Sequence, residues 1–552
     1  IAGNFTLANG DYAPVLAGTI TVQNGTLTST GAELTSLKAM TLPVPSCGSV
    51  FVQRASGVCP ATTAGDWGGL VLDAGKANQL TNSAVRYAAT GISMGTPTGT
   101  RQAQNLTLTN TSITNTAADG ISTRSPLWTS GGAFTNNGAH GITIDLTNVT
   151  SSAFQPLSIS ALTISGSGQE AILAVGLAGQ TVQIDQASID HAGAFGINLK
   201  DAGKDAGPYP GVYTIDPGRL TLTNNTVTNT AATFPAIYLN GFFGPFANVS
   251  GNRGASNGVD AIAFHGTVTD DLAWTTARKA SDPTTPLGYV LDSTLTMAAP
   301  PPPLPPAPPP TPAARTLTVR AGDVVKVGNG GVLQLRGVNL QADDTGSSGQ
   351  KVFTSLTDDS VGVATCHSVL VNACPATIQP GAWGGITLTG GSANGALVNA
   401  AVRYAATGIL ITSGASSTSG SSVFGLVVSG SSIGPNAIDG ISAVKTAISV
   451  STSSISGGAH GISVDLSGGI PGTPVRLSGN RFTSTSADAI LGQALAGQPV
   501  WITDNRIQGA GTYGIRLLSA DQLVLRNNNI AASGGGPGAG AGRYPAIYLP
   551  AL

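Results

Sequence analysis

Two histidines at matched positions are the side chains of this chain best suited to acid–base chemistry. His140 and His460 each lie in the string Ala-His-Gly-Ile, once in each half of the chain. Imidazole exchanges a proton near neutral pH, as acid–base catalysis requires. One aspartate stands in the string before each histidine, Asp119 in the first half and Asp439 in the second. Neighbouring strings carry Thr, Asp, Phe or Tyr at the histidine position, so we interpret it as a structural corner and expect no catalytic role.

An arginine–tyrosine pair also recurs, and its chemistry is that of sugar binding. The string Ala-Val-Arg-Tyr-Ala-Ala-Thr-Gly-Ile occurs twice and contains Arg86, Tyr87, Arg403 and Tyr404. A sugar ring can stack on tyrosine, and arginine binds a carboxylate through two parallel hydrogen bonds. The structural alternative, which we favour, has Val85 and Val402 pointing inward. The arginine and tyrosine then cover an edge and the tryptophan of the same block.

Calcium is the metal to consider, and one segment offers carboxylates for it. Asp201, Asp205 and Asp216 lie in DAGKDAGPYPGVYTIDPGR, a segment that the second half lacks. Calcium needs six or more oxygen ligands, and the sequence does not visibly supply them. We therefore expect no cofactor, with calcium at these three aspartates as the open alternative. Two Asp-Asp pairs are interpreted as turn and cap residues: Asp343-Asp344 and Asp358-Asp359.

The four cysteines form two close pairs, Cys47 with Cys59 and Cys366 with Cys374. Each pair precedes the tryptophan block of its half. The spacing within the pairs differs while the pairing is kept, as a loop-closing disulfide allows. Zinc is the alternative, but two sulfurs without a nearby His/Cys set make a poor zinc site. We predict two disulfides and, because disulfides persist in oxidising surroundings, an extracellular or cell-surface location.

The elements that position these residues repeat at two scales. The string Gly-x-Trp-Gly-Gly surrounds both Trp67 and Trp383, so the chain contains an internal duplication. Within each copy a short marker that contains Gly-Ile or Ala-Ile recurs every few tens of residues. Runs such as NLTLTNTSITNT lie between markers and alternate apolar with polar residues, which is typical of strands.

This pattern predicts an all-β parallel β-helix, in which each coil buries its apolar face on the next coil. Glycine before isoleucine predicts a bend that needs positive φ or a close backbone approach. Asn224-Asn225 and Asn527-Asn528-Asn529 predict left-handed corners and side-chain ladders between coils. An array of β-sandwiches would explain the short strands but not one marker that recurs throughout both copies.

A proline-rich segment divides the two copies. We predict a first β-helix unit at 1–298, a proline-rich linker or extruded loop at 299–315, and a second unit at 316–552. Proline fixes φ and lacks a backbone donor, so the segment is expected to adopt polyproline II rather than to join a sheet.

Composition excludes several classes of protein. Formal net charge is −2, which gives no electrostatic case for nucleic acid or an anionic membrane as partner. No uninterrupted apolar stretch is long enough for a membrane span. Only 9% of residues are charged, but short alternating apolar runs occur throughout, so the chain is not expected to be disordered.

The strings KVFTSLTDDSVG, PGAWGGITL and VNAAVRYAATGI resemble secreted bacterial right-handed β-helix repeat proteins of the pectin-lyase-like superfamily. The upstream string TLTVRAGDVVKVGNGGVLQLRG resembles the strand-rich entry to that helix in the same surface proteins. The resemblance covers most of both copies and implies a right-handed parallel β-helix. It does not imply one activity, because the superfamily includes polysaccharide lyases, polygalacturonases, phage tailspikes and adhesins.

The motifs of the polygalacturonase-like members are incomplete in this chain. Their Asn-Thr-Asp motif is missing, and their paired aspartates are reduced to one in each copy. Ala-His-Gly only loosely matches their Gly-His-Gly. Where they carry Arg-x-Lys, this chain has Asn198-Leu199-Lys200 and Arg516-Leu517-Leu518. We therefore expect no enzyme.

The leading hypothesis is a non-catalytic, extracellular structural or adhesive β-solenoid, a candidate subunit of a surface fibre. Its expected partners are copies of itself, joined end to end, and surface glycans. One alternative is a polysaccharide-acting lyase or glycoside hydrolase. The other is a carbohydrate- or ice-binding solenoid, suggested by the threonine-rich runs. The second copy stops at PAIYLPAL, where the first copy continues, so we expect the chain to extend beyond Leu552 or to meet a neighbouring subunit.

Overall fold

A computed structural model describes most of the chain as parallel β-strands. The described residues are 5–7, 18–23, 25–36, 61–72, 76–95, 106–147, 156–203, 219–298, 314–344, 349–390, 394–412, 424–469, 472–520, 522–531 and 544–550. Helical structure in these ranges is limited to one short 3-10 turn, η2 (Phe246–Asn248). The prediction of an all-β, right-handed parallel β-helix is confirmed.

The chain divides into two compact units, which are described separately. The first contains 1–244, 248–263 and 278–287, and the second contains 245–247, 264–277 and 288–552. Strand β26 (Val259–Val268) contains residues of both. The predicted boundaries at 298 and 316 stay a prediction. Residues 299–313 of the proline-rich segment lie outside the described residues, and the segment connects β28 (Gly288–Ala298) to β29 (Arg315–Thr318), which both belong to the second unit.

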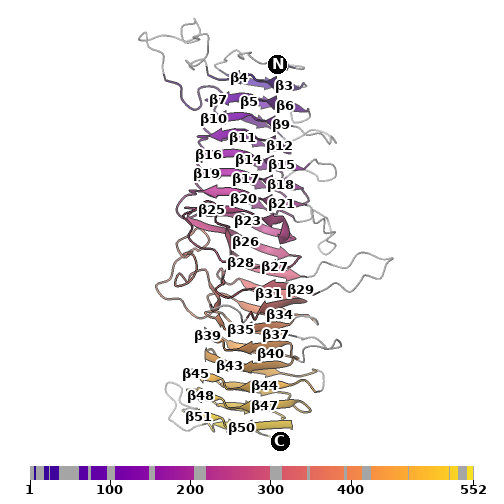
Figure 1. The fold of residues 1–552 in the computed structure, drawn as a ribbon, viewed down its shortest axis with the longest axis vertical. Helices are drawn as coiled ribbons and strands as arrows, with labels where there is room; N and C mark the ends of the chain where they lie inside the picture. The colour runs from indigo at the N-terminus through magenta and orange to yellow at the C-terminus, as the bar shows by residue number, and fades with distance from the viewer. Residues whose placement is uncertain are drawn as a thin grey trace, which may run out of the picture. The chain divides into compact units, whose positions relative to one another are not determined.

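Strands of the first unit stack in three parallel ladders, called a, b and c (Figure 1). Ladder a contains β1 (Phe5–Leu7), β3 (Leu27–Thr30), β6 (Asn78–Thr81), β9 (Leu106–Thr109), β12 (Leu127–Ser130), β15 (Leu157–Ser160), β18 (Val182–Asp185), β21 (Leu220–Thr223) and β24 (Val249–Ser250). Ladder b contains β4 (Glu33–Leu34), β7 (Ala84–Arg86), β10 (Ser112–Thr114), β13 (Ala133–Thr135), β16 (Thr163–Ser167), β19 (Ser188–Ala192), β22 (Thr226–Thr228) and β25 (Arg253–Ala255). Ladder c contains β2 (Thr19–Val22), β5 (Gly69–Leu72), β8 (Ile92–Met94), β11 (Ile121–Thr123), β14 (Ile142–Asp145), β17 (Ile172–Val175), β20 (Ile197–Lys200) and β23 (Pro235–Gly244).

The second unit has the same three ladders. Its ladder a contains β27 (Leu272–Ala273), β29, β32 (Val338–Ala342), β35 (Gly395–Val398), β38 (Leu426–Ser429), β41 (Ile448–Ser451), β44 (Val475–Ser478), β47 (Pro499–Thr503) and β50 (Gln522–Arg526). Ladder b contains β30 (Val324–Val327), β33 (Lys351–Ser355), β36 (Ala400–Val402), β39 (Ser432–Asn436), β42 (Ser454–Gly457), β45 (Arg481–Thr483), β48 (Arg506–Gln508) and β51 (Asn529–Ala531). Ladder c contains β28, β31 (Val332–Arg336), β34 (Gly385–Thr389), β37 (Ile409–Thr412), β40 (Asp439–Val444), β43 (His460–Asp465), β46 (Ile490–Gln493), β49 (Ile515–Leu517) and β52 (Ile547–Tyr548).

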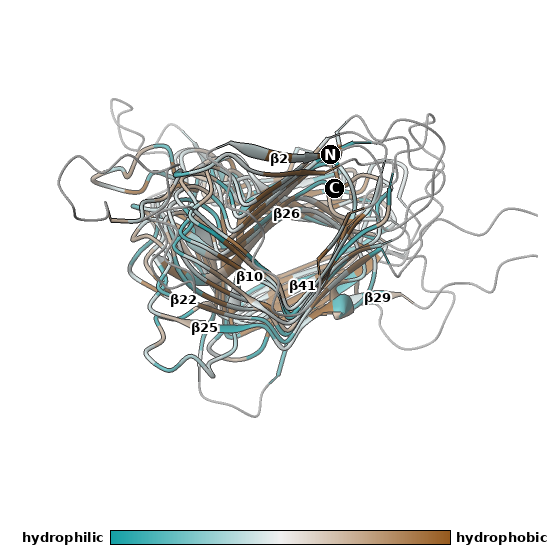
Figure 2. Cartoon of the chain, turned by 90° about the horizontal axis from the view of Figure 1, so that it is seen from above, coloured by the Kyte–Doolittle hydropathy of each residue, from teal (hydrophilic) through white to brown (hydrophobic). Residues whose placement is uncertain are grey.

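The marker isoleucines explain why one short string recurs. In ladder c each marker places its isoleucine in register with that of the coil before. These side chains are buried, on the strands that Figure 2 shows from above. Each fully buried isoleucine contributes roughly 1.5–3 kcal/mol relative to exposure. In the first unit the buried column is Ile20, Leu70, Ile92, Ile121, Ile142, Ile172, Ile197 and Ile237. In the second unit it is Leu333, Ile386, Ile409, Ile441, Ile462, Ile490 and Ile515.

Asparagine corners occur as predicted. Asn224 and Asn527 adopt left-handed conformations, with φ of 55° and 53°. Buried asparagines beside such corners form ladders in which each amide donates to the next coil's side-chain oxygen, satisfying groups that would otherwise be buried without a partner. These ladders are Asn225 to Asn252 at 2.9 Å, and Asn480 to Asn505 to Asn528 at 3.0 and 2.9 Å.

Glycine before isoleucine is required by close approach and not by positive φ. A Cβ on Gly141 would lie 2.7 Å from the carbonyl oxygen of Ala171 on the next coil. A Cβ on Gly461 would lie 2.7 Å from that of Ala489. Neither glycine has a φ in the left-handed region. Of the two reasons that the sequence offered, only the close approach applies at these positions.

Candidate functional site

The recurring tryptophan has the same environment in both units. Trp67 and Trp383 are buried, with 3% and 0% of their surface exposed. The indole nitrogen of Trp67 donates to the carbonyl of Arg86 at 2.7 Å, and that of Trp383 to the carbonyl of Arg403 at 2.8 Å. Burial together with a satisfied donor is what a structural tryptophan needs.

The glycines of the same block permit that packing. Gly69 and Gly385 have φ of 95° and 109°, a region that favours glycine. A Cβ on either residue would lie 1.7 Å from the carbonyl oxygen of Thr90 or of Thr407. The backbone geometry of this coil therefore requires glycine at this position in both units.

Each recurring arginine has a carboxylate of its own unit as partner. Arg403 Nη2 lies 2.6 Å from Asp358 Oδ2 and donates to Ser360 Oγ at 2.9 Å. Arg86 Nε lies 3.4 Å from Glu33 Oε1. Burial opposes ionisation of Asp358, but hydrogen bonds from Ser360 and Thr354 and the nearby Arg403 hold its pKa below the ordinary value.

The tyrosines that follow these arginines are half-buried. Tyr87 and Tyr404 have φ of 59° and 63°, in the left-handed region. The guanidinium carbon of Arg403 lies 5.7 Å from the centre of the Tyr404 ring, a cation–π contact. Val85 and Val402 are fully buried. Contact of these arginines and tyrosines with a carbohydrate stays a prediction.

Asp358 and Asp359 fix the loop that precedes the second tryptophan. Asp358 accepts hydrogen bonds from the backbone and hydroxyl of Ser360 at 3.2 and 2.6 Å. Asp359 accepts from the backbone of Thr365 at 2.7 Å and of Cys366 at 3.1 Å. These are turn contacts of the kind that short polar side chains make.

Two lysines of ladder b are buried, and one of them, Lys326, contacts this loop. Lys326 Nζ donates to the carbonyl of Val363 at 2.6 Å and lies 3.5 Å from Asp359 Oδ1. Burial lowers the pKa of Lys326, although the carboxylates of Asp359 and Asp358 oppose the change. Lys351 Nζ lies 2.7 Å from Asp344 Oδ1. The loop therefore packs on β30 through a cation as well as through turn contacts.

A disulfide closes the same loop. Cys366 and Cys374 are bonded, with their Cα atoms 5.2 Å apart. The predicted pair Cys47–Cys59 lies outside the described residues.

His140 lies at the centre of an ion ladder across three coils of the first unit. Its Nδ1 lies 2.9 Å from Asp119 Oδ1 on the coil before, and its Nε2 lies 3.3 Å from Glu170 Oε2 on the coil after. Asn198, one coil further, donates to Glu170 at 3.1 Å. Asp119, His140 and Glu170 each lie two residues before the first isoleucine of their strand in ladder c, and the three side chains are 14–16% exposed.

This ladder is charged at neutral pH. Burial alone would lower the pKa of His140, but hydrogen bonds and charge from Asp119 and Glu170 raise it to about 9. Burial raises the pKa of Asp119 and of Glu170, and their bonds to His140 outweigh it, so both values are lowered. An imidazolium between two carboxylates is an arrangement in which each charge stabilises the next.

The second unit has an equivalent ion ladder in which some residues differ. His460 Nδ1 lies 2.9 Å from Asp439 Oδ1, a hydrogen bond that raises the pKa of His460 despite burial. The following coil supplies Asp488, which accepts hydrogen bonds from the hydroxyl of Thr512 and the backbone of Tyr513. Arg516 Nη1 lies 3.9 Å from Asp488 Oδ2. An arginine thus stands where the first unit has Asn198.

An aromatic trio lies on the two coils that follow each ion ladder. In the first unit the ring of Phe195 stacks on that of Tyr238, with the ring centres 5.1 Å apart. It also contacts Phe234 edge to face, with the ring centres 5.0 Å apart. In the second unit Tyr513 lies 5.0 Å from Tyr548 and 5.2 Å from Tyr544. Arg516 lies over two of those rings, 5.5 Å from Tyr513 and 6.0 Å from Tyr548. A planar aromatic group beside charged side chains is suited to contact with a sugar.

The structure describes one of the three aspartates predicted as a calcium site. Asp201 lies directly after β20 with a φ of 58°, and Asp205 and Asp216 lie outside the described residues. Within the described ranges, no group of three or more His, Cys, Asp or Glu side chains is placed to hold a metal ion. A calcium site at these aspartates stays a prediction.

Glu170 and Asp488 were not singled out from the sequence. Both are the first residue of a marker that ends in Ala-Ile-Leu, one coil after the histidine. Aligning the markers on their isoleucine would have placed Asp119, His140 and Glu170 in one column. The missing signal was therefore the alignment of the coils and not the type of the residue.

No protein family, curated protein or solved structure matches the chain. In the part of the chain that the structure describes, no helix is long and apolar enough to span a membrane.

The pKa of His140 gives a pH-dependent stability with a defined sign. A pKa raised from 6.5 to about 9 means that the ion pairs of His140 stabilise the fold fully below about pH 6.5 and that this contribution is lost as pH rises through about 9. Replacing His140 with glutamine should therefore lower the urea midpoint at pH 6.5, and this difference should shrink at pH 9.5. His191→Gln, at a histidine 68% exposed, is the matched control. An equal difference at both pH values would contradict the assignment.

Proposed function

We propose that this chain is a non-catalytic, extracellular β-solenoid with a structural or adhesive role, a candidate subunit of a surface fibre. We further propose that it is related to the secreted right-handed β-helix proteins of the pectin-lyase-like superfamily. The observation that carries the proposal is that the residues repeated between the units are engaged in the fold. The indole of each tryptophan donates to a carbonyl of its own unit, the glycines leave no room for a side chain, and each arginine forms an ion pair with a carboxylate of its own unit.

The acid–histidine ladder argues against glycoside hydrolysis. That reaction needs a carboxylic acid whose pKa is raised, so that it can protonate the leaving oxygen, and a second carboxylate. In the first unit the pKa values of both Asp119 and Glu170 are lowered, so neither side chain is a proton donor at neutral pH. Both carboxylates and both nitrogens of His140 already have a partner within the ladder.

An extracellular location is supported by the disulfide. The bond between Cys366 and Cys374 is of a kind that persists in oxidising compartments. Stacked coils whose backbone groups bond from one coil to the next stabilise each unit without one large core. Both features suit a protein that functions outside the cell.

Glycan binding is the form of adhesion that the surface favours. Each unit carries the aromatic trio next to a charged ladder, and Tyr544 and Tyr548 are 39% and 36% exposed. Ice binding is less well supported, because it needs a flat array of threonines. In ladder a the neighbours of Thr107 are Gln79 and Trp128, so the threonine array is interrupted.

Retention on polysaccharide tests the adhesive role. The full chain should be retarded in gels containing a soluble polysaccharide that it binds, and Tyr238→Ala with Tyr548→Ala should weaken retention about tenfold through the loss of two stacking rings. Trp128→Ala is the matched control, because Trp128 is 37% exposed but lies on ladder a. Equal retention of the double variant and the wild type would exclude the aromatic trio as the glycan-binding site. If the wild type were not retained on any polysaccharide of a broad panel, the adhesive role would be excluded and only the structural role would remain.

A further inference from the structure

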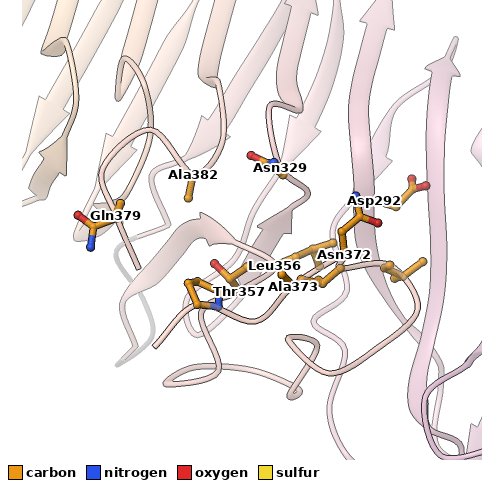
Figure 3. Close-up of a pocket in the computed structure, with 11 residues that line it drawn as sticks. Asp292, Asn329, Leu356, Thr357, Asn372, Ala373, Gln379 and Ala382 are labelled. Atoms are coloured by element: carbon orange, nitrogen blue, oxygen red, sulfur yellow. The ribbon is translucent and has the colours of Figure 1, made fainter. Parts of the chain in front are cut away.

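A pocket of about 440 Å³ lies in the second unit beneath the disulfide-closed loop (Figure 3). One wall comes from the solenoid itself, through Asp292 of β28, Asn329 and Leu356. The opposite wall includes Val371 and Asn372, which lie between the two bonded cysteines. Figure 3 shows Gln379 at the end of the pocket away from Asp292. This volume lies in the range of small-molecule sites.

The pocket is held in shape before any ligand arrives. The disulfide fixes the ends of the loop segment that carries Val371 and Asn372. Asp359 accepts hydrogen bonds from the backbone of Cys366, and Lys326 anchors the loop through Val363. A site formed in this way loses little conformational entropy on binding.

The lining has the two kinds of surface that a sugar ring requires. Leucine, valine, alanine and proline side chains supply an apolar wall for the C–H face of the ring. A carboxylate, three amides and a hydroxyl supply donors and acceptors for its hydroxyl groups: Asp292, Asn329, Asn372, Gln379 and Thr357. A few polar groups on an apolar wall are typical of sites that bind and orient a small molecule.

Charge narrows the class of sugar. Asp292 is the charged residue of the lining, its side chain is 12% exposed, and its carboxylate is bonded to His265 Nδ1 at 3.0 Å. Among the described residues that line the pocket there is no lysine or arginine. The lining therefore presents a carboxylate that is already paired with His265 and no cationic side chain for an anionic ligand.

We propose that this pocket binds a small saccharide without negative charge, one or two sugar rings at the end of a glycan. The inference rests on the proposed adhesive role and names a second place, separate from the aromatic trio, at which a glycan is held. Binding depends on the disulfide, because four of the eleven lining residues lie in the loop that the disulfide closes: Leu370, Val371, Asn372 and Ala373.

Ligand-observed NMR on the full chain tests the proposal. The probes are D-glucose, D-galactose, N-acetyl-D-glucosamine and cellobiose, with D-galacturonate as the anionic comparison. Val371→Trp fills the pocket and leaves the disulfide intact, whereas Cys366→Ser with Cys374→Ser opens the loop. The Tyr238→Ala/Tyr548→Ala variant keeps the pocket and lacks the trio. Circular dichroism establishes that each variant retains its strands.

We expect at least one neutral sugar to bind, with affinity reduced at least about tenfold by Val371→Trp and by the cysteine variant but unchanged in the tyrosine variant. Binding that survives Val371→Trp would overturn the proposal, as would binding of galacturonate as tight as that of the neutral sugars. Absence of binding by all four neutral sugars would also overturn it. The pocket variants should keep their retention on polysaccharide, because the aromatic trio is intact in them. A failure of the pocket proposal is therefore distinguishable from a failure of the proposed adhesive role.

Discussion

Replacing Trp383 with alanine should lower the free energy of unfolding of the second unit by about 3–5 kcal/mol. The side chain is fully buried, so its removal leaves a large cavity at the first coils of the unit. It also removes the donor that satisfies the carbonyl of Arg403. Urea titration followed by circular dichroism measures the change, with the two units fitted as separate transitions.

Two further variants separate the causes of that loss. Trp383→Phe keeps most of the apolar volume but leaves the Arg403 carbonyl without its donor, so the expected loss is smaller, about 1–3 kcal/mol. Trp67→Ala should produce a comparable loss in the first unit, because Trp67 makes the equivalent hydrogen bond to Arg86. If Trp383→Ala left the urea midpoint unchanged, the recurring block would not be the structural element that we infer.

Replacing Lys326 with methionine should cost about 2–3 kcal/mol and should loosen the disulfide-closed loop. Methionine keeps the apolar stem but removes the ammonium, which leaves the carbonyl of Val363 and the hydroxyl of Thr365 without their donor. Asp359 is partly exposed and stays hydrated, so the loss remains below that of a fully buried ion pair. Limited proteolysis should then cleave between 357 and 382 faster than in the wild type.

Lys351→Met is the matched control for this prediction. Lys351 is equally buried, but its partners are Asp344 and the carbonyl of Val398 and not the loop. Its replacement should lower stability without raising cleavage between 357 and 382. Equal cleavage in the two lysine variants would show that Lys326 stabilises the unit in general and does not hold the loop.

The fold was predictable because its determinants are local and repeated. Each marker places one isoleucine in a buried column, and a coil cannot bury its face without the next. Asparagine corners follow from the tolerance of that residue for positive φ, as at Asn224 and Asn527. Only the reason for the marker glycines needed the structure, since a close carbonyl such as that of Ala171 is invisible in a sequence.

The candidate sites were less predictable because they depend on contacts between distant segments. All four residues of β30 are buried, including Lys326, because a loop that follows some thirty residues later covers the outer face of the strand. Alternation alone would leave one face of such a strand in solvent. The partnership of His140 with Glu170 emerges only when the markers of successive coils are aligned on their isoleucines. The pocket beneath the disulfide-closed loop is hard to predict for both reasons: a later loop forms one wall, and residues of different coils form the other.

Product analysis on polysaccharides tests the central claim, that the repeated residues maintain the fold and do no chemistry, most directly. The full chain and the variant His140→Ala/His460→Ala are incubated with polyuronides and with neutral glycans, and new reducing ends and unsaturated products are measured over time. We predict no products from either protein above the buffer blank, together with a lower urea midpoint for the variant. Products formed by the wild type and lost in the variant, with both proteins folded, would contradict the account and make the histidine ladder an active site.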